Sequence, residues 1–361
     1  MYCRNERRNQ KDFMYKLIMK VIGVVLMALV LVFSEETKAE RSRSKQTEID
    51  DSFYQKLEDG TDVNILIVGD SIGEGAGASS NSSFWVSLLQ AYLQDTYSIS
   101  NINVTNVSMG GNASYAGYVR TMSLNDNVQY DLAVICYGQN DDIEDFSTYY
   151  ESVVRGIRRK YPNSSIISIL ESSQREYTGK MIDIQHICKH YGIPVADTIA
   201  AFNNSGKVYE DLSNDGVHPN DEGQKIYFET VKKVIDDNVE ASSGKMKEVS
   251  ALNRSVYKFD NFAWYGADSD FARVDDTTFI LNMSASGIMG IDYTYESGDN
   301  NAYIYVDGKL FKSPTVTFDY DFSQRHILIV SDECMVENEI KVVFASKEQA
   351  DGFKGMCFSW K

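Results

Sequence analysis

The sequence has few of the residues that build metal and redox sites. Only four histidines and five cysteines occur among its 361 residues. The cysteines follow none of the spacings typical of zinc or dithiol sites, so we expect no metal centre. Cys136 and Cys188 lie within apolar patterns and are interpreted as small buried side chains. Cys334 and Cys357 could pair in an oxidising compartment, but the sequence alone cannot place their thiols in contact.

A basic surface is also missing. The formal net charge is −17, although residues 1–45 carry ten basic side chains against five acidic ones. The rest of the chain is therefore even more acidic than the whole, and no basic stripe interrupts it. Because such a body repels phosphate backbones, nucleic acid is excluded as a partner.

Long hydrophobic runs are absent as well. The longest uncharged apolar stretch, Val21–Phe33, has thirteen residues and follows a basic start. A membrane-spanning helix needs about 20 apolar residues, whereas a shorter run after basic residues is typical of an export signal. Residues 1–39 are therefore predicted to be a signal peptide, or an uncleaved membrane anchor if Lys16 and Lys20 reach the interface. Either alternative places the protein outside the cell or on its surface.

The polar residues 40–60 are interpreted as a solvated tether, after which strand and helix patterns alternate through residues 61–240. This alternation predicts a parallel sheet covered on both faces, a three-layer α/β/α sandwich of the flavodoxin-like type. The expected strands are Val63–Val68, Ile102–Met109, Asp131–Tyr137, Ser165–Leu170 and Ile193–Ala196. The expected helices are Phe84–Leu93, Tyr115–Met122, Phe146–Tyr161, Lys180–Tyr191 and Gln224–Val239.

The pattern changes after residue 240. Residues 241–254 are small and charged, as in a linker, and from 255 to 361 the apolar period becomes two. Tyr303–Phe311 contains an Asp-Gly turn and predicts a hairpin, and three further strands are expected at Thr315–Phe318, His326–Val330 and Glu339–Phe344. We therefore expect a C-terminal β-sandwich of jelly-roll type. Trp264, Tyr265 and Trp360 could stack on sugar rings, although aromatic residues in a sandwich are usually core.

Chemistry is concentrated where the first expected strand ends. Val63–Val68 leads directly into Gly69-Asp70-Ser71, which places a hydroxyl at the carboxyl end of a buried strand. Alone, this stretch could equally cradle a phosphate or turn the chain. Asp215-Gly216-Val217-His218 supplies the missing groups: His218 can accept a proton from Ser71, and Asp215 can orient the imidazole.

Two further motifs, Asn106–Gly111 and Gly138-Gln139-Asn140-Asp141, can contribute donors that stabilise an oxyanion. Backbone N–H groups at Ser71 and Gly111, together with the side-chain amide of Asn140, are suitable donors. Asp70 and Asp141 lie beside these motifs and are interpreted as loop-stabilising acceptors instead of proton-transfer groups.

These motifs, in this order, resemble those of the SGNH or GDSL hydrolase superfamily over about residues 60–240. The resemblance implies that Ser71 is the nucleophile, that Asp215 and His218 complete the triad, and that Gly111 and Asn140 complete the oxyanion hole, without a cofactor. The sequence departs from the family at Ser108 and Gly110, which stand where the family often has Gly and Ser, respectively. This departure makes Gly110 the alternative donor. Glu74 departs too and makes the site more acidic.

The function expected from these features is an exported serine esterase that removes small acyl groups, most simply acetyl, from a carbohydrate. The carbohydrate part rests on export and the additional β-domain. Three alternatives stay open: an O-acetyltransferase with the same acyl-enzyme, a lipase or lysophospholipase, and a non-catalytic glycan-binding surface protein.

Overall fold

The computed structural model describes residues 52–125, 127–241 and 249–361. The expected signal or anchor, and the tether as far as residue 51, lie outside the described residues. Within the described ranges no helix is both long enough and apolar enough to cross a membrane.

The first half of the chain forms a five-stranded parallel sheet in the order β2-β1-β3-β4-β5. The three central strands β1, β3 and β4 are almost wholly buried, and all five residues of β3 are inaccessible to solvent, whereas the edge strands β2 and β5 are partly exposed. A strand that is buried on both faces needs apolar residues at every position, which is why these runs do not alternate with polar residues. The order confirms the flavodoxin-like prediction. The strands are β1 (Val63–Gly69), β2 (Ile102–Asn106), β3 (Leu132–Cys136), β4 (Ser165–Leu170) and β5 (Val195–Asp197).

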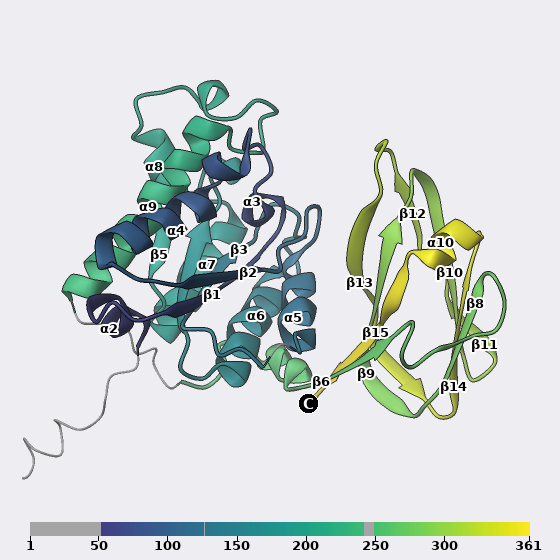
Figure 1. Ribbon diagram of the computed structural model, residues 1–361. Helices are drawn as coiled ribbons and strands as arrows, with labels where there is room; N and C mark the ends of the chain where they lie inside the picture. The colour runs from purple at the N-terminus through teal and green to yellow at the C-terminus, as the bar shows by residue number, and fades with distance from the viewer. Residues whose placement is uncertain (1–51, 126, 242–248) are drawn as a thin grey trace, which may run out of the picture. The chain divides into compact units, whose positions relative to one another are not determined.

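Helices cover both faces of this sheet (Figure 1). One core cluster contains residues of α5, α6 and α7, and the other contains residues of α2, α4 and α9. The three-layer prediction is therefore confirmed. The helices are α2 (Phe53–Glu58), α3 (Ser71–Glu74), α4 (Trp85–Tyr97), α5 (Ser114–Ser123), α6 (Phe146–Lys160), α7 (Gly179–Tyr191), α8 (Thr198–Asn203) and α9 (Asp221–Glu240).

Two segments expected to lie outside the folded core, the tether and the linker, are packed against the α/β half of the chain. The tether prediction is wrong from residue 52 onward, because Phe53, Tyr54 and Leu57 of α2 are buried against the sheet. The end of the expected linker is also held in place: the backbone N–H groups of Leu252 and Asn253 donate to the buried Glu151 carboxylate, at 2.6 and 2.8 Å.

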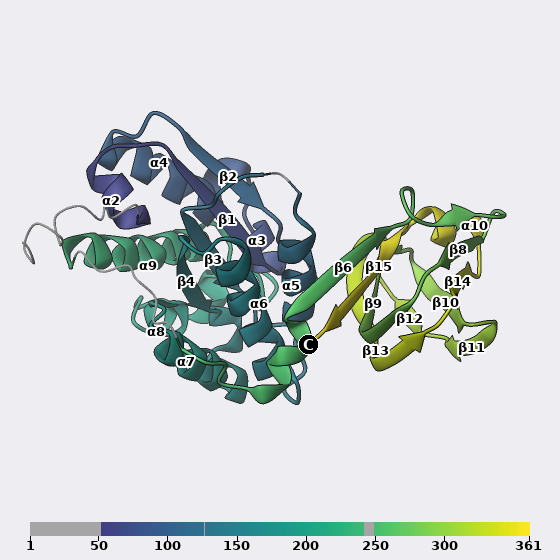
Figure 2. The ribbon, with the colours of Figure 1, turned by 90° about the horizontal axis from the view of Figure 1, so that it is seen from below.

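The second half of the chain folds into two antiparallel sheets (Figure 2). One has the order β11-β10-β14-β8-β7 with β12 beside β10, and the other has the order β13-β9-β15-β6. Both contribute to one apolar core, as expected for a β-sandwich. The strands are β6 (Asn261–Gly266), β7 (Ala272–Arg273), β8 (Thr278–Asn282), β9 (Ala285–Tyr295), β10 (Gly298–Val306), β11 (Lys309–Lys312), β12 (Thr315–Phe318), β13 (Gln324–Val336), β14 (Glu339–Phe344) and β15 (Phe353–Trp360).

Local predictions in this sandwich have mixed outcomes. The Asp-Gly hairpin is confirmed, with Asp307 and Gly308 at φ values of 49° and 78° between β10 and β11. Cys334 and Cys357 do not pair; both thiols are free, and the Cys357 Sγ lies 3.4 Å from the Tyr115 hydroxyl. Trp264 packs against the cluster shared with the α/β part and Tyr265 against the sandwich core, whereas Trp360 is 39% exposed, so the interpretation as core residues fails for Trp360.

Residues 52–361 form one compact unit. Its two halves share an apolar cluster to which α5 contributes Tyr115 and Tyr118, and the β-sandwich contributes Ile288, Ile327 and Cys357. Strand β13 therefore lies against the α/β half of the chain, close to the loop that leads into α5.

Candidate active site

Ser71 lies where β1 ends and the single turn of α3 begins. Asp70 caps this turn: its Oδ1 accepts a hydrogen bond of 3.0 Å from the Ile72 N–H. Gly75 ends the turn with a φ of 105°, a conformation that glycine adopts without steric cost. Strand β1, the Asp70 N-cap and the Gly75 C-cap together fix the position of Ser71 at the carboxyl end of the strand, where 9% of the residue remains exposed.

His218 and Asp215 lie in the loop before α9, and the structure brings both to Ser71. The His218 Nε2 is 2.9 Å from the Ser71 Oγ, and the His218 Nδ1 is 2.6 Å from the Asp215 Oδ2. The Asp215 Oδ1 accepts from the backbone N–H groups of Val217 and His218. Partial burial acts to raise the pKa of Asp215, but hydrogen bonds from the His218 ring and these N–H groups outweigh it and hold that pKa well below its ordinary value.

A buried glutamine ties the serine and histidine loops together. The Gln224 Nε2 donates to the carbonyl oxygens of Ala76 and Pro219, both at 3.1 Å, and its Oε1 accepts from the Trp85 N–H. Gly77 lets the two loops approach each other, because a Cβ at this position would lie 2.4 Å from the Pro219 carbonyl oxygen. Sequence reasoning missed Gln224, since a glutamine inside an amphipathic helix is ordinarily a surface residue.

The predicted oxyanion donors come from loops that lie against Ser71 and Asp70: a Cβ added to Gly110 would lie 3.6 Å from the Ser71 Cβ, and Asn140 contacts Asp70. The Gly110 N–H donates to the Glu74 Oε2 at 2.8 Å, whereas the N–H groups of Ser71 and Gly111 have no hydrogen-bond partner in the described part of the chain. This difference favours Gly111 over Gly110 as a donor. The Asn140 Nδ2 donates to the Asp70 Oδ2 and to the Asn112 carbonyl oxygen, at 3.3 and 3.2 Å, so both of its N–H groups have acceptors and one must be released before Asn140 can donate to an oxyanion. We refer to the loop that contains Gly110 and Gly111 as the oxyanion loop. Glu74 holds this loop through the Gly110 N–H and also adds negative charge to the site.

A group of carboxyl side chains is buried behind these donors. Asp70 and Glu171 are fully inaccessible to solvent. Burial raises the pKa of Glu171 to about 7, and burial together with the neighbouring Glu171 carboxyl raises the pKa of Asp70 well above its ordinary value. Burial also raises the pKa of Asp141, even though Ser114 donates to it. These carboxyl groups therefore retain protons at pH values where exposed ones are ionised.

The β-sandwich also reaches the candidate site, which sequence reasoning missed. A Cβ added to Gly110 would lie 2.8 Å from the Gln324 Nε2, and one added to Gly111 would lie 2.7 Å from the Gln324 Oε1. The Gln324 amide at the start of β13 therefore covers the oxyanion loop. The His326 Nε2 lies 3.1 Å from the Gln324 Oε1, and burial lowers the pKa of His326 to about 4, which keeps its ring neutral at pH 7.

Aromatic side chains continue outward from His326. Its ring stacks on Tyr295 with a centroid distance of 4.4 Å, and Phe318 packs against its edge. Phe318 contacts both Tyr320 and Phe322, whose exposed fractions are 59% and 50%. We refer to Tyr320 and Phe322 as the exposed aromatic pair. No local motif marks this pair, because it is connected to Gly110 and Gly111 only through Phe318, His326 and Gln324.

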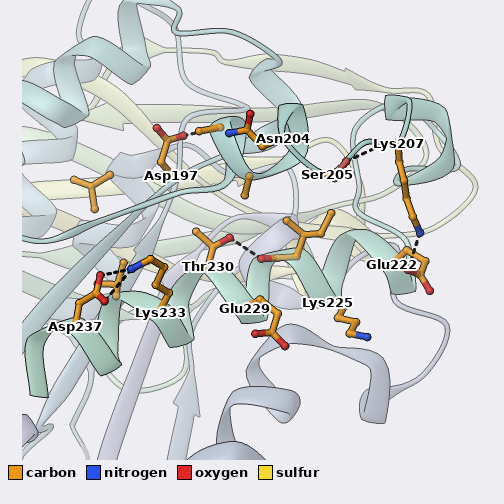
Figure 3. A pocket seen from close by; sticks show the side chains of 15 residues that line it. Asp197, Asn204, Ser205, Lys207, Glu222, Lys225, Glu229, Thr230, Lys233 and Asp237 are labelled. Atoms are coloured by element: carbon orange, nitrogen blue, oxygen red, sulfur yellow. Dashed lines mark hydrogen bonds and ion pairs between the residues drawn. The ribbon is translucent and has the colours of Figure 1, made fainter. Parts of the chain in front are cut away.

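A separate groove lies between α8 and α9 (Figure 3). Its lining includes Asp197, Lys207, Glu222 and Lys233; the ion pair Lys207–Glu222, at 2.8 Å, joins the segment after α8 to α9, and Lys233–Asp237, at 2.7 Å, lies along α9. Because neither Ser71 nor His218 lines it, the groove has no part in the chemistry of the candidate site. In the described ranges, no three or more His, Cys, Asp or Glu side chains are grouped so that they could hold a metal ion.

The comparisons with known proteins agree with this geometry. The model of the GDSL-like Lipase/Acylhydrolase family matches residues 67–226. A crystal structure of a two-domain esterase active on acetylated mannans, co-crystallised with mannopentaose, is 16% identical, with a TM-score of 0.69 over 85% of this chain and 93% of that chain. A second structure described as a two-domain esterase active on acetylated mannans gives a TM-score of 0.67 at 16% identity, over 85% of this chain and 94% of that one.

A psychrotrophic esterase from Pseudoalteromonas sp. is 21% identical with a TM-score of 0.41, over 49% of this chain and 98% of that chain. No curated protein sequence matches this chain. The two structures with TM-scores of 0.69 and 0.67 show the fold, and the family model covers residues 67–226. Residues 67–226 therefore belong to the GDSL-like lipase/acylhydrolase family, and the chain is a carboxylic ester hydrolase.

Proposed function

We propose that the protein is a serine esterase that removes short acyl groups from a carbohydrate through an acyl-enzyme on Ser71. The observation that carries the proposal is an unbroken hydrogen-bonded chain: the Ser71 Oγ lies 2.9 Å from the His218 Nε2, and the His218 Nδ1 lies 2.6 Å from the Asp215 Oδ2. A serine hydroxyl is a weak nucleophile unless a neighbouring base accepts its proton. Asp215 holds the proton on the Nδ1 of His218, so the Nε2 is free to act as that base.

In the first half-reaction the Ser71 Oγ attacks the ester carbonyl carbon while its proton passes to His218. The negative charge that develops on the carbonyl oxygen is stabilised by the N–H groups of Ser71 and Gly111 and by the Asn140 amide. When the tetrahedral intermediate collapses, the carbon–oxygen bond to the sugar breaks, and His218 gives its proton to the leaving sugar oxygen. The products are a free sugar hydroxyl and an acyl ester on Ser71.

In the second half-reaction a water molecule takes the place of the sugar. His218 accepts a proton from this water as it attacks the acyl carbon, and the same donors stabilise the second oxyanion. Return of the proton to the Ser71 oxygen releases a carboxylic acid and restores the enzyme. A sugar hydroxyl in place of water would complete an acyl transfer, so measurement of both products distinguishes hydrolase from transferase.

Three observations support a short acyl group on a sugar. The polar side chains of Glu74 and Gln324 flank the oxyanion loop, which disfavours a long hydrocarbon chain there. The exposed aromatic pair is connected through Phe318 and His326 to Gln324, and aromatic faces bind the apolar faces of sugar rings. The two-domain neighbour described as active on acetylated mannans has the same two-part fold. We further propose that residues 1–39 direct the enzyme to the cell surface or outside the cell.

Turnover of p-nitrophenyl acetate by the chain tests the catalytic part of this proposal. Ser71→Ala and His218→Ala should each lower kcat by at least about a thousandfold, since the residues of a triad act as a unit. Ser82→Ala, at an exposed serine of the neighbouring turn, is the matched control and should keep the wild-type rate. Equal rates for wild type and Ser71→Ala would contradict the nucleophile assignment.

Substrate choice is tested separately. Acetate release from acetylated mannan or xylan should exceed octanoate release from an octanoyl ester at equal concentrations of ester. A preference for octanoyl esters would instead support the lipase alternative. Acetylated oligosaccharide formed from a donor ester faster than free acetate would support the transferase.

A further inference from the structure

Asn112 follows the oxyanion loop directly and is 2% exposed. Its carboxamide makes three hydrogen bonds. The Nδ2 donates to the carbonyl oxygens of Gly110 and Arg325, both at 2.8 Å, and the Oδ1 accepts from the Ile327 N–H at 3.0 Å. A buried amide can make few more bonds than these, so the side chain is close to saturated and its position is well determined.

The two bonds to Arg325 and Ile327 lie on the free edge of a sheet. Strand β13 is the edge strand of the order β13-β9-β15-β6, so one side of its backbone has no partner strand among the described residues. Residues 325 and 327 are two positions apart, and their backbone groups point to the same side. The Asn112 carboxamide pairs with this edge as a neighbouring strand would, with one donor and one acceptor.

The backbone of Asn112 points into the candidate active site. Its carbonyl oxygen accepts the bond from the Asn140 Nδ2, and its own side chain also holds the Gly110 carbonyl. Two of the three oxyanion donors, the Gly111 N–H and the Asn140 amide, are thus adjacent to groups that Asn112 fixes. A donor misplaced by about 1 Å loses much of its effect on the transition state.

We propose that Asn112 is a positioning residue that couples strand β13 of the β-sandwich to the oxyanion hole. The inference rests on the proposed function, because it assigns a role within that site. It makes the β-sandwich necessary for turnover of any ester, including one too small to touch the exposed aromatic pair. An accessory domain that only bound glycan would affect carbohydrate substrates alone.

The test compares Asn112→Ala with Tyr118→Phe in the full chain. Tyr118 donates a buried hydrogen bond of 3.0 Å to the Phe259 carbonyl oxygen, so Tyr118→Phe also removes a contact between distant segments, but one that is remote from the oxyanion donors. Asn112→Asp is a second variant, which keeps an acceptor for Ile327 but turns a carboxylate oxygen toward the Gly110 and Arg325 carbonyls. In each preparation, titration with a p-nitrophenyl phosphonate counts the competent Ser71, and p-nitrophenyl acetate turnover is divided by that count.

We expect kcat per titrated Ser71 to fall about 10- to 100-fold in both Asn112 variants, with KM changed less than threefold. Tyr118→Phe should lower the melting temperature but keep kcat within twofold. If Asn112→Ala or Asn112→Asp retains kcat within twofold per titrated site, Asn112 is merely structural and the inference fails. Ser71→Ala separates this failure from failure of the proposed function: an inactive Ser71→Ala beside an active Asn112→Ala refutes the coupling alone.

Discussion

The two glycines of the oxyanion loop allow a quantitative test of how closely Gln324 packs on that loop. A Cβ at Gly110 would meet the Gln324 Nε2 at 2.8 Å and the Glu74 Oε2 at 3.0 Å, both ends of flexible side chains. Overpacking of this kind costs about 1–3 kcal/mol. If the loop shifts to relieve it, the donors move, so Gly110→Ala should lower kcat/KM by roughly 5- to 150-fold.

Gly111→Ala has a second cost that Gly110→Ala does not have. Its φ is 68°, in the left-handed region, where a residue with a Cβ loses about 1–2 kcal/mol. Its Cβ would also lie 2.7 Å from the Gln324 Oε1. The two costs together amount to roughly 2–5 kcal/mol. Gly111→Ala should therefore be the more damaging substitution of the two.

Removal of Gln324 separates the two costs. In a Gln324→Ala background, Gly110→Ala should return to within about threefold of its parent, whereas Gly111→Ala should remain about 5- to 30-fold below its parent because the backbone cost persists. The assay is p-nitrophenyl acetate turnover per active site. Gly206→Ala is the control for backbone strain alone, since its φ is 75° and a Cβ would meet nothing within 4 Å. Additive effects, with coupling below about 0.5 kcal/mol, would refute the packing of Gln324 on the loop.

Three further outcomes are expected. Asp215→Asn should lower kcat by about 100- to 10,000-fold, because an amide donates to the His218 Nδ1 and leaves the proton on its Nε2; activity within fivefold of wild type would exclude the orienting role. Glu171→Gln should raise the melting temperature more at pH 8 than at pH 5, since a folded-state pKa of about 7 exceeds the unfolded value and stability is lost as pH rises between them; an unchanged pH dependence would place the proton elsewhere. Replacing Tyr320 and Phe322 by alanine should raise KM for an acetylated mannan about tenfold and leave p-nitrophenyl acetate turnover unaltered, and equal effects on both substrates would disprove a sugar-binding role.

The order of the sheet and its helices follows from the sequence because each element carries its own pattern. Runs such as Leu132–Cys136 are apolar at every position, and only burial on both faces explains them. Helix α2 escapes this reasoning, because its three buried residues lie among polar neighbours in a segment too short to show a period. Its helical state depends on packing against the sheet, which the local sequence does not encode.

Strand β9 shows a second limit of sequence reasoning. Glycines at 287 and 290 weaken its strand pattern, yet a Cβ at Gly290 would lie 2.3 Å from the Tyr115 hydroxyl. The glycine is therefore required where the sandwich meets α5, a contact between residues far apart in the chain. Motif spacing predicts that Ser71, Asp215 and His218 belong to one site. It gives no sign of Asn112, Gln324 or His326, whose importance arises only when β13 reaches the loop.

The attachment of Asn112 to β13 also bears on how the chain is made. Its two partners on that strand lie 213 and 215 residues further along the sequence. A polypeptide emerges from the ribosome amino terminus first, so the segment around Ser71 waits for most of the remaining chain before its last neighbours exist. Contacts of such long range are also slow to form. The proposed coupling therefore implies that a still-emerging chain that already contains Ser71, Asp215 and His218 does not yet cleave an ester.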